Sequence, residues 1–260
     1  MKKYLCLLAV LFVCLAGCSS RYDSGAIQTY LDATQQLQEV DSMHLDISGK
    51  VYLDEDKEQS IARVGMNGDM ILEGPMQMAF DLEYAFSGIA FDDLHFYIKD
   101  NTMYLDMFEE KSKISFQQYA ALIDALQDAN TDTAAADEDS VKEMFKEFKY
   151  KDKEAGIIAF SFDLDRLEEM SGGMSGGAKL KDFIKSYTGT MKIQDQTLTE
   201  LTFDLVVAVE GKQYPVSVTV SFAKQNEIKK IKFPSFKGYK EQSMQLDEAA
   251  DLIDEAGSEL

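Results

Sequence analysis

Side chains able to act as general bases, nucleophiles or metal ligands are scarce in this chain, apart from its carboxylates. It contains two histidines, His44 and His95, and three cysteines among 260 residues. Both histidines occupy polar positions of alternating segments, beside Asp46 and Tyr97, so we expect them to face solvent. A zinc site needs several ligands converging on one point, and a Ser-His-Asp triad needs a histidine held between its two partners. The sequence therefore predicts no metal site, no catalytic residues and no enzymatic activity.

Three other patterns that could carry chemistry each lack a necessary part. The glycine-rich run 172–177 precedes Lys179 at the wrong spacing for a phosphate-binding loop, and no Ser or Thr follows that lysine. The acidic groups at 137–139 and 163–165 lack the glycine and the final glutamate of a calcium loop. Nothing singles out a glycosidase pair among the 46 acidic residues. We interpret the glycines as a hinge and the carboxylates as solvated surface.

Cys18 is the residue with the most specific chemical context. A basic start at residues 1–3 is followed by an uncharged apolar stretch from Tyr4 to Ala16, which ends in Leu15-Ala16-Gly17-Cys18. This order is typical of a secretory signal, and the stretch is shorter than the roughly 20 residues of a membrane span. The last four residues resemble the lipobox of bacterial lipoproteins, although an ordinary signal with an incidental cysteine is the alternative. The resemblance implies cleavage before Cys18, a diacylglycerol thioether on its sulfur, and a membrane-anchored protein facing the extracellular or cell-wall side.

The part of the chain after this signal is strongly acidic and has no other thiol. Cys6 and Cys14 precede the cleavage point, so neither a disulfide nor a thiolate metal site is expected in the mature chain. Loss of Lys2 and Lys3 leaves 24 basic and 46 acidic residues, a net charge near −22. Such a charge repels nucleic acid phosphates and anionic headgroups. We expect no nucleic acid partner and a domain held off the membrane surface.

Alternating apolar and polar residues predict strands in the first half of the chain, after a helix over residues 25–41. Strands are expected over 43–53, 62–72 and 76–86. The second of them either turns back at Asn67-Gly68 or runs on to a turn at 73–75. We favour the longer strand because Pro75 lacks a ladder donor and is the firmer breaker. A hairpin turning at Asp100-Asn101 should pair Ile98 with Met103, Phe96 with Leu105 and Leu94 with Met107.

Two helices are predicted next, one from Ser115 and one from Ser140 that carries Phe145 and Phe148. A strand over 158–162 follows. A hairpin turning at Glu210-Gly211 should pair Leu201 with Val220, Phe203 with Val218, Leu205 with Val216 and Val207 with Tyr214. A further strand is expected over 228–233, before an acidic and weakly helical tail. One antiparallel sheet with helices on a single apolar face accounts for this order.

Several of these segments are similar to a known family. They are the helix end Leu-Gln-Glu-Val-Asp-Ser at 37–42, the strands Met-His-Leu-Asp-Ile at 43–47 and Met-Gln-Met-Ala-Phe at 76–80, and the hairpin at 96–105. With the lipobox, they resemble the Met-rich lipoproteins of Gram-positive bacteria, related to the half-barrel carriers LolA and LolB and to the mycobacterial LppX/LprG type. The resemblance covers most of residues 25–233. It implies an α+β fold in which a curved antiparallel half-barrel sheet carries helices on its concave apolar face, around a cavity for acyl chains.

The resemblance and the patterns together divide the chain into four parts: a signal peptide (1–17), a lipidated tether (18–25), a half-barrel domain (26–238) and an acidic C-terminal tail (239–260). No cofactor is expected, and the domain is expected to be a monomer.

The candidate ligand-binding residues are the Met- and Phe-rich positions of the predicted sheet. Methionine adapts its shape to irregular apolar ligands. The expected cavity lining is Met70, Leu72, Met76, Met78, Phe80, Leu82, Phe96, Ile98, Met103 and Met107. These side chains could instead pack against helices as a solid core. The first alternative predicts a carrier of lipid or another hydrophobic ligand, and the second predicts a non-enzymatic module that docks another envelope protein.

Overall fold

The computed structural model describes residues 21–108, 110–115, 137–170, 180–209 and 211–242. In chain order its strands are β1 (Ser42–Tyr52), β2 (Ser60–Ile71), β3 (Gln77–Phe86), β4 (Ile89–Lys99), β5 (Thr102–Met107), β6 (Glu110–Ser115), β7 (Phe145–Asp152), β8 (Ile157–Phe162), β9 (Ile184–Gln194), β10 (Thr197–Val209), β11 (Lys212–Ala223) and β12 (Lys240–Glu241). The helices are α2 (Ser24–Gln38), α4 (Glu138–Met144), α5 (Leu164–Met170) and α6 (Leu180–Phe183).

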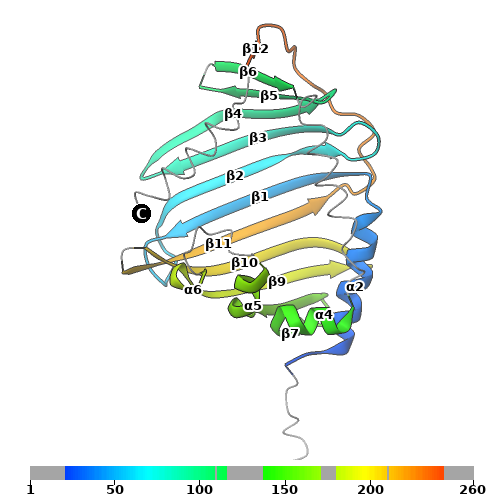
Figure 1. The fold of residues 1–260 in the computed structure, drawn as a ribbon, viewed down its shortest axis with the longest axis vertical. Coiled ribbons are helices and arrows are strands. Elements are labelled where there is room, and N and C mark those ends of the chain that lie inside the picture. Colours follow the sequence, from blue (N-terminus) through cyan, green and yellow to red (C-terminus); the bar gives the residue numbers. More distant parts are fainter. Residues whose placement is uncertain (1–20, 109, 116–136, 171–179, 210, 243–260) are drawn as a thin grey trace, which may run out of the picture.

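All of these strands belong to one open, curved sheet with few helices (Figure 1). Their order is β12-β6-β5-β4-β3-β2-β1-β11-β10-β9-β8-β7, and neighbours are antiparallel except for the short parallel pair of β12 with β6. The sheet therefore consists of two meanders, β1–β6 and β7–β11, joined where β1 pairs with β11. A predominantly antiparallel, curved α+β sheet, as expected from the sequence, is confirmed.

Both hairpin predictions are confirmed residue by residue. Asp100 and Asn101 have φ angles of 51° and 56°, the left-handed pair of a type I′ turn, which matches the twist of the strands it joins. The observed pairs are Ile98 with Met103, Phe96 with Leu105 and Leu94 with Met107. In the second meander, β10 and β11 pair as predicted, with Leu201 opposite Val220, Phe203 opposite Val218, Leu205 opposite Val216 and Val207 opposite Tyr214.

The strand β2 is continuous through Asn67-Gly68, which confirms the favoured alternative. The chain reverses after Ile71, around Pro75. Gly68 lies opposite Phe80 in the ladder, and the backbone at Ala79 and Phe80 and the Phe80 ring occupy the space that a side chain at position 68 would need.

Helix α2 covers the apolar face of the second meander. Asp23 caps it by accepting from the backbone N–H groups of Gly25 and Ala26 at 2.8 and 3.1 Å. Its buried residues join an aromatic core, and α2 also contacts β7, β9 and β10. The core consists of Ala26, Ile27, Ala33, Val141, Phe145, Phe148, Ile158, Phe160, Met191 and Ile193. None of the helices in the described ranges is long and apolar enough to span a bilayer.

The prediction of one helix carrying Phe145 and Phe148 is wrong. Helix α4 ends at Met144, and both phenylalanines belong to β7, where Phe148 lies opposite Phe160. A β-bulge between Phe145 and Glu147 inserts an extra residue. The bulge places two side chains three positions apart on the same face of a strand, which is the spacing of a helical face.

The predicted strand at 228–233 is also wrong. In this stretch the backbone makes no ladder, and Pro234 removes a donor just beyond it. The segment 228–239, which we call the strap, crosses the polar face of the sheet and ends at β12 on its far edge. Two of its own side chains, Ile231 and Tyr239, are buried. The helix predicted from Ser115 falls outside the described residues, and Ser115 itself ends β6.

Gly68→Ala is expected to destabilise the protein by about 1–3 kcal/mol, the usual cost of overpacking. An added Cβ would lie 2.0 Å from the carbonyl oxygen of Ala79 and 2.7 Å from the Cα of Phe80, and neither backbone atom can give way cheaply. Gly65→Ala, on the same strand, is the matched control because its Cβ would approach only Glu83, at 3.5 Å. Urea unfolding measures both variants, and equal losses would contradict the prediction.

Candidate ligand-binding face

The alternate, apolar residues of β1–β6 lie on one side of the sheet and form a continuous surface, which we call the Met/Phe face. One row of directly paired residues crosses six strands: Met43, Met70, Met78, Ile98, Met103 and Ile114. The next row runs from Leu45 over Gly68 to Phe80, Phe96 and Leu105. A third contains Ile47, Met66, Leu82, Leu94 and Met107. Paired residues on antiparallel strands share a face, so these rows present their side chains to one side.

The structure brings the predicted lining residues together on this surface. Eight of them lie on β2–β5 in the three rows, and the two others, Leu72 and Met76, flank the turn between β2 and β3. Phe80 and Ile98 are 4% and 6% exposed, Leu72 is exposed, and the rest are half-buried. That they line a cavity remains a prediction.

Exposure of the Met/Phe face rises along the strands. It is lowest at the end where β4 turns into β5, and highest at the opposite end, where Phe86 and Ile89 are 50% and 62% exposed. Three further aromatic residues extend this exposed end, which we call the aromatic rim: Tyr84, Phe91 and Phe108. The ring centroids of Tyr84 and Phe91 lie 6.2 Å apart, and those of Phe91 and Phe108 lie 5.3 Å apart. Phe108 has a φ of 53°, an uncommon conformation for a bulky residue, and its ring is 62% exposed.

The sequence did not single out this rim, although Tyr84 and Phe86 have the same parity as Met78. Ile114 was missed for a different reason. It sits on β6, whose remaining residues are Glu, Lys and Ser, and too few apolar positions alternate there to indicate a strand.

The apolar face is covered differently in the two meanders. In β7–β10 the face is packed under α2, and the ring of Phe145 contacts the rings of Phe148 and Phe160 at centroid distances of 5.0 and 5.4 Å. The helix contacts reported for the described residues fall on β7, β9 and β10, at the lower end of the sheet in Figure 1. The half made of β1–β5 therefore carries the adaptable methionines, and the other half carries the rigid aromatic core.

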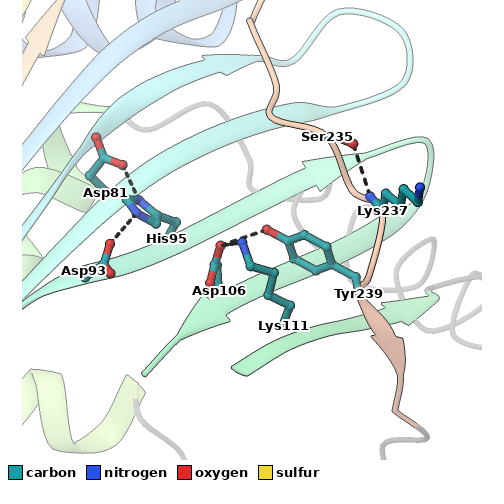
Figure 2. Close-up of polar contacts among 8 residues, drawn as sticks. All are labelled: Asp81, Asp93, His95, Asp106, Lys111, Ser235, Lys237 and Tyr239. Carbon is teal, nitrogen blue, oxygen red and sulfur yellow. Dashed lines mark hydrogen bonds and ion pairs between the residues drawn. The ribbon is translucent and has the colours of Figure 1, made fainter. Parts of the chain in front are cut away.

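The opposite face holds the charged groups. His95 on β4 lies between two carboxylates, with Nδ1 2.7 Å from Asp81 and Nε2 3.2 Å from Asp93 (Figure 2). Partial burial disfavours the imidazolium, but the two carboxylates that accept from it outweigh that effect and raise the pKa of His95 above 6.5. His44 similarly contacts Asp69 at 2.7 Å. Both histidines lie on the polar face, as predicted.

The strap is held on this polar face by ring stacking and one shared carboxylate. Phe236 stacks on Tyr104 with centroids 3.7 Å apart. Asp106 accepts from Lys111 Nζ at 2.6 Å and from Tyr239 Oη at 3.3 Å (Figure 2). Burial, with the nearby charge of Asp106, raises the pKa of the Tyr239 phenol to about 12. These groups fasten the strap to β5.

Among the described residues, no group of three or more His, Cys, Asp or Glu side chains is arranged to hold a metal ion. The acidic stretch at 137–139 caps α4 through Asp137, which accepts from the N–H of Ser140 at 2.8 Å. The glycine-rich run 172–177 lies outside the described residues.

Comparison with known proteins adds one structural similarity. No protein-family model matches the chain, and no curated protein matches it. Among solved structures, the fold is similar to that of the lipoprotein LppX of Mycobacterium tuberculosis, with a TM-score of 0.47 and 11% sequence identity. The match covers 81% of this chain and 100% of the LppX chain. Similarity at this level carries no inference about ligand or activity.

The raised pKa of His95 predicts a pH-dependent contribution to stability. A raised folded-state pKa stabilises the fold fully below the unfolded value near 6.5, and this stabilisation is lost as pH rises through the folded value. A double-mutant cycle of His95→Gln and Asp81→Asn, measured by urea unfolding, should therefore give a larger coupling at pH 5.5 than at pH 8.5. A coupling that grows with pH would contradict the assignment.

Proposed function

We propose that this chain is an exported lipoprotein, anchored to the cell membrane through Cys18, that binds or carries a lipid or another hydrophobic ligand on its Met/Phe face. It acts as a monomer, on the extracellular or cell-wall side, and performs no catalysis. The sheet then corresponds to a half-barrel of the LolA/LolB and LppX/LprG type, with the ligand held on its concave side.

The observation that carries this proposal is the division of the apolar face. If the apolar face served only as a core, both meanders could be packed in the same way, with aromatic rings as in β7–β10. Instead β1–β5 present Met43, Met66, Met70, Met78, Met103 and Met107, side chains that fit varied apolar shapes. Exposure increases toward one end of this surface, as a binding face open at that end would require.

The energy available on such a face suits a lipid. Each buried methylene contributes about 0.8 kcal/mol, so ten methylenes give about 8 kcal/mol before ordering costs. Association itself costs at least about 4 kcal/mol, so micromolar affinity, about −8.2 kcal/mol, requires about 15 buried methylenes. The carrier therefore needs to cover most of one acyl chain to hold a lipid reversibly.

A second function is supported by a different observation. Phe80, Ile98 and Ile114 are already buried, as in a solid core. If the whole Met/Phe face is packed in this way, the protein is a docking module for another envelope protein, and no ligand enters it.

Retention of lipid distinguishes the two functions. We expect the chain from residue 18 onward, incubated with total membrane lipids and repurified, to release lipid on denaturing extraction. Met78→Gln combined with Met103→Gln should reduce that amount about tenfold or more, because each buried amide left without a partner costs about 1–3 kcal/mol. Both residues pair with Ile98, so the substitutions fall on neighbouring positions of the row nearest the β4–β5 turn.

Glu83→Gln is the matched control, since Glu83 is exposed on the other face of β3. It should leave lipid retention unchanged. Mass spectrometry of the extracts provides the measurement. If the unsubstituted chain releases no lipid above the background of an unrelated protein, the carrier function fails and the docking module is favoured.

The anchor has a separate test in cells. Cys18→Ala removes the only thiol on which the lipid can be placed, so incorporation of a fatty-acid probe should be abolished and the precursor should stay uncleaved. Ser19→Ala, next to it, should change neither. Normal labelling of the Cys18→Ala chain would show that the anchor lies elsewhere.

A further inference from the structure

Three exposed rings meet at one corner of the Met/Phe face, at the left of Figure 1 where β3 turns into β4. Tyr84 and Phe91 are directly paired on these two strands, and their rings are inclined to each other by only 15°. Phe108 follows β5 in a left-handed conformation, and its ring meets that of Phe91 at an angle of 89°. The aromatic rim therefore presents two near-parallel rings and a third at right angles to one of them.

The rings of the rim are open to solvent. Tyr84, Phe91 and Phe108 are 42%, 37% and 62% exposed, so their contacts with one another do not cover them. Elsewhere in the protein a lysine lies over an aromatic ring, as Lys99 Nζ does 5.4 Å from the centroid of Phe233. Within the described ranges, no lysine or arginine lies over a ring of the rim. A ring face attracts a cation through its quadrupole, so the rim offers an attraction that no described side chain uses.

The segments that border the rim are acidic. They are residues 53–64, 82–94 and 106–111, and they contain ten acidic and three basic residues. At 0.1 M salt the Debye length is about 10 Å, so charges on neighbouring strands, about 4.8 Å apart, still act on a group bound at the rim. The local field, like the net charge of the protein, therefore favours a cation over an anion.

The three basic side chains of these segments do not balance that charge. Lys57 forms an ion pair with Asp204 at 2.5 Å. Lys111 forms one with Asp106 at 2.6 Å. Arg63 lies on the polar face, because it alternates along β2 with the residues of the Met/Phe face. The rim consequently keeps an excess of negative charge.

One carboxylate belongs to the Met/Phe face itself. Glu110 of β6 is paired with Met107, so the two side chains share a face, and a single residue separates Glu110 from Phe108. Glu110 is exposed, and no lysine or arginine of the described ranges lies within ion-pair distance of it. Lys240 of β12 lies one same-face position further along, opposite Ser112, and makes no ion pair with Glu110. A cation on the Phe108 ring would thus have a carboxylate of the same face as its counter-charge.

We propose that the aromatic rim and Glu110 form a subsite for the positively charged ammonium headgroup of a lipid whose acyl chain lies on the Met/Phe face. Aromatic rings of this kind recognise quaternary ammonium groups in other proteins. The hydrocarbon then extends toward Phe80 and Ile98, which are 4% and 6% exposed, and the open, acidic end holds the cation. The inference rests on the lipid-binding function proposed above and adds the class of headgroup. The competing explanation is that the rings only extend the apolar surface for the acyl chain, in which case the charge of the headgroup makes no difference.

Two amphiphiles that differ in charge but hardly in shape test the headgroup subsite. Tetradecyltrimethylammonium carries a fixed positive charge, and tetradecyldimethylamine oxide is its uncharged counterpart at pH 8. The chain from residue 18 onward is titrated with each of them below its micelle concentration, in about 0.15 M salt so that distant charges are screened. We expect the ammonium to bind about tenfold more tightly than the amine oxide. Isothermal titration calorimetry measures both affinities.

Two variants of the rim identify the source of the preference. Phe91→Leu combined with Phe108→Leu keeps the surface apolar and removes two ring faces, and Glu110→Gln removes the counter-charge. Each should reduce the tenfold preference to about threefold or less, and leave the affinity for the amine oxide unchanged within about twofold. Phe183→Leu and Glu227→Gln make the same changes at exposed positions away from the rim, and should keep the preference.

Each outcome decides between the explanations. Equal affinities of the unsubstituted chain for the two amphiphiles would overturn the headgroup subsite and leave the carrier function in place. A preference that survives both rim variants would also overturn the subsite, because the net charge of the protein would then be its cause. Binding of neither amphiphile would overturn the carrier function and the subsite with it. Since Glu110 is exposed, Glu110→Gln decides the question even if the double leucine variant fails to fold.

Discussion

The constraint on which this structure depends is the period of two along its strands. Because paired residues share a face, the register that places Met70 opposite Met78 also places Phe80 opposite Phe96, and a slip of one residue would expose every such side chain. A sheet of this width then has one apolar face too large for a single helix. Helix α2 covers β7–β10 and forms a ring-packed core there. On the methionine-rich half, by contrast, the sheet alone does not determine what packs against the apolar side chains.

The polar face is organised by a segment without regular structure. The strap adds rings to a surface of carboxylates, and Tyr104 and Tyr97 provide the aromatic platform that it needs. Asp106 is satisfied from two sides by Lys111 and Tyr239, which links β5 to the C-terminal end of the described chain. The short pair of β12 with β6 then covers an edge whose residues would otherwise offer unpaired backbone groups.

The turn residues and the alternation of apolar side chains were sufficient to predict both hairpins. Asp100 and Asn101 tolerate the left-handed conformation, and only one register places the flanking apolar residues on the same face. The ten candidate residues were found together for the same reason. The α4–β7 boundary could not be predicted, since the bulge after Phe145 gives a strand the three-residue spacing of a helix. The strap was misread because Phe233 is apolar for a tertiary reason: its ring contacts Tyr97 of β4, which is remote in sequence.

The pairing of β1 with β11 also has a kinetic consequence. Apart from the pairs β8–β9 and β12–β6, the other paired strands follow one another in the chain with short connections, and such contacts form quickly. The join in the middle of Figure 1 connects residues such as Ile47 and Val220, so it closes a loop that contains most of the domain. The two meanders are expected to collapse separately, and their meeting along β1 and β11 is expected to limit the rate of folding. If the chain is exported from its N-terminus as proposed, the edge of β1 stays unpaired until β11 (Lys212–Ala223), after about four-fifths of the chain, has emerged.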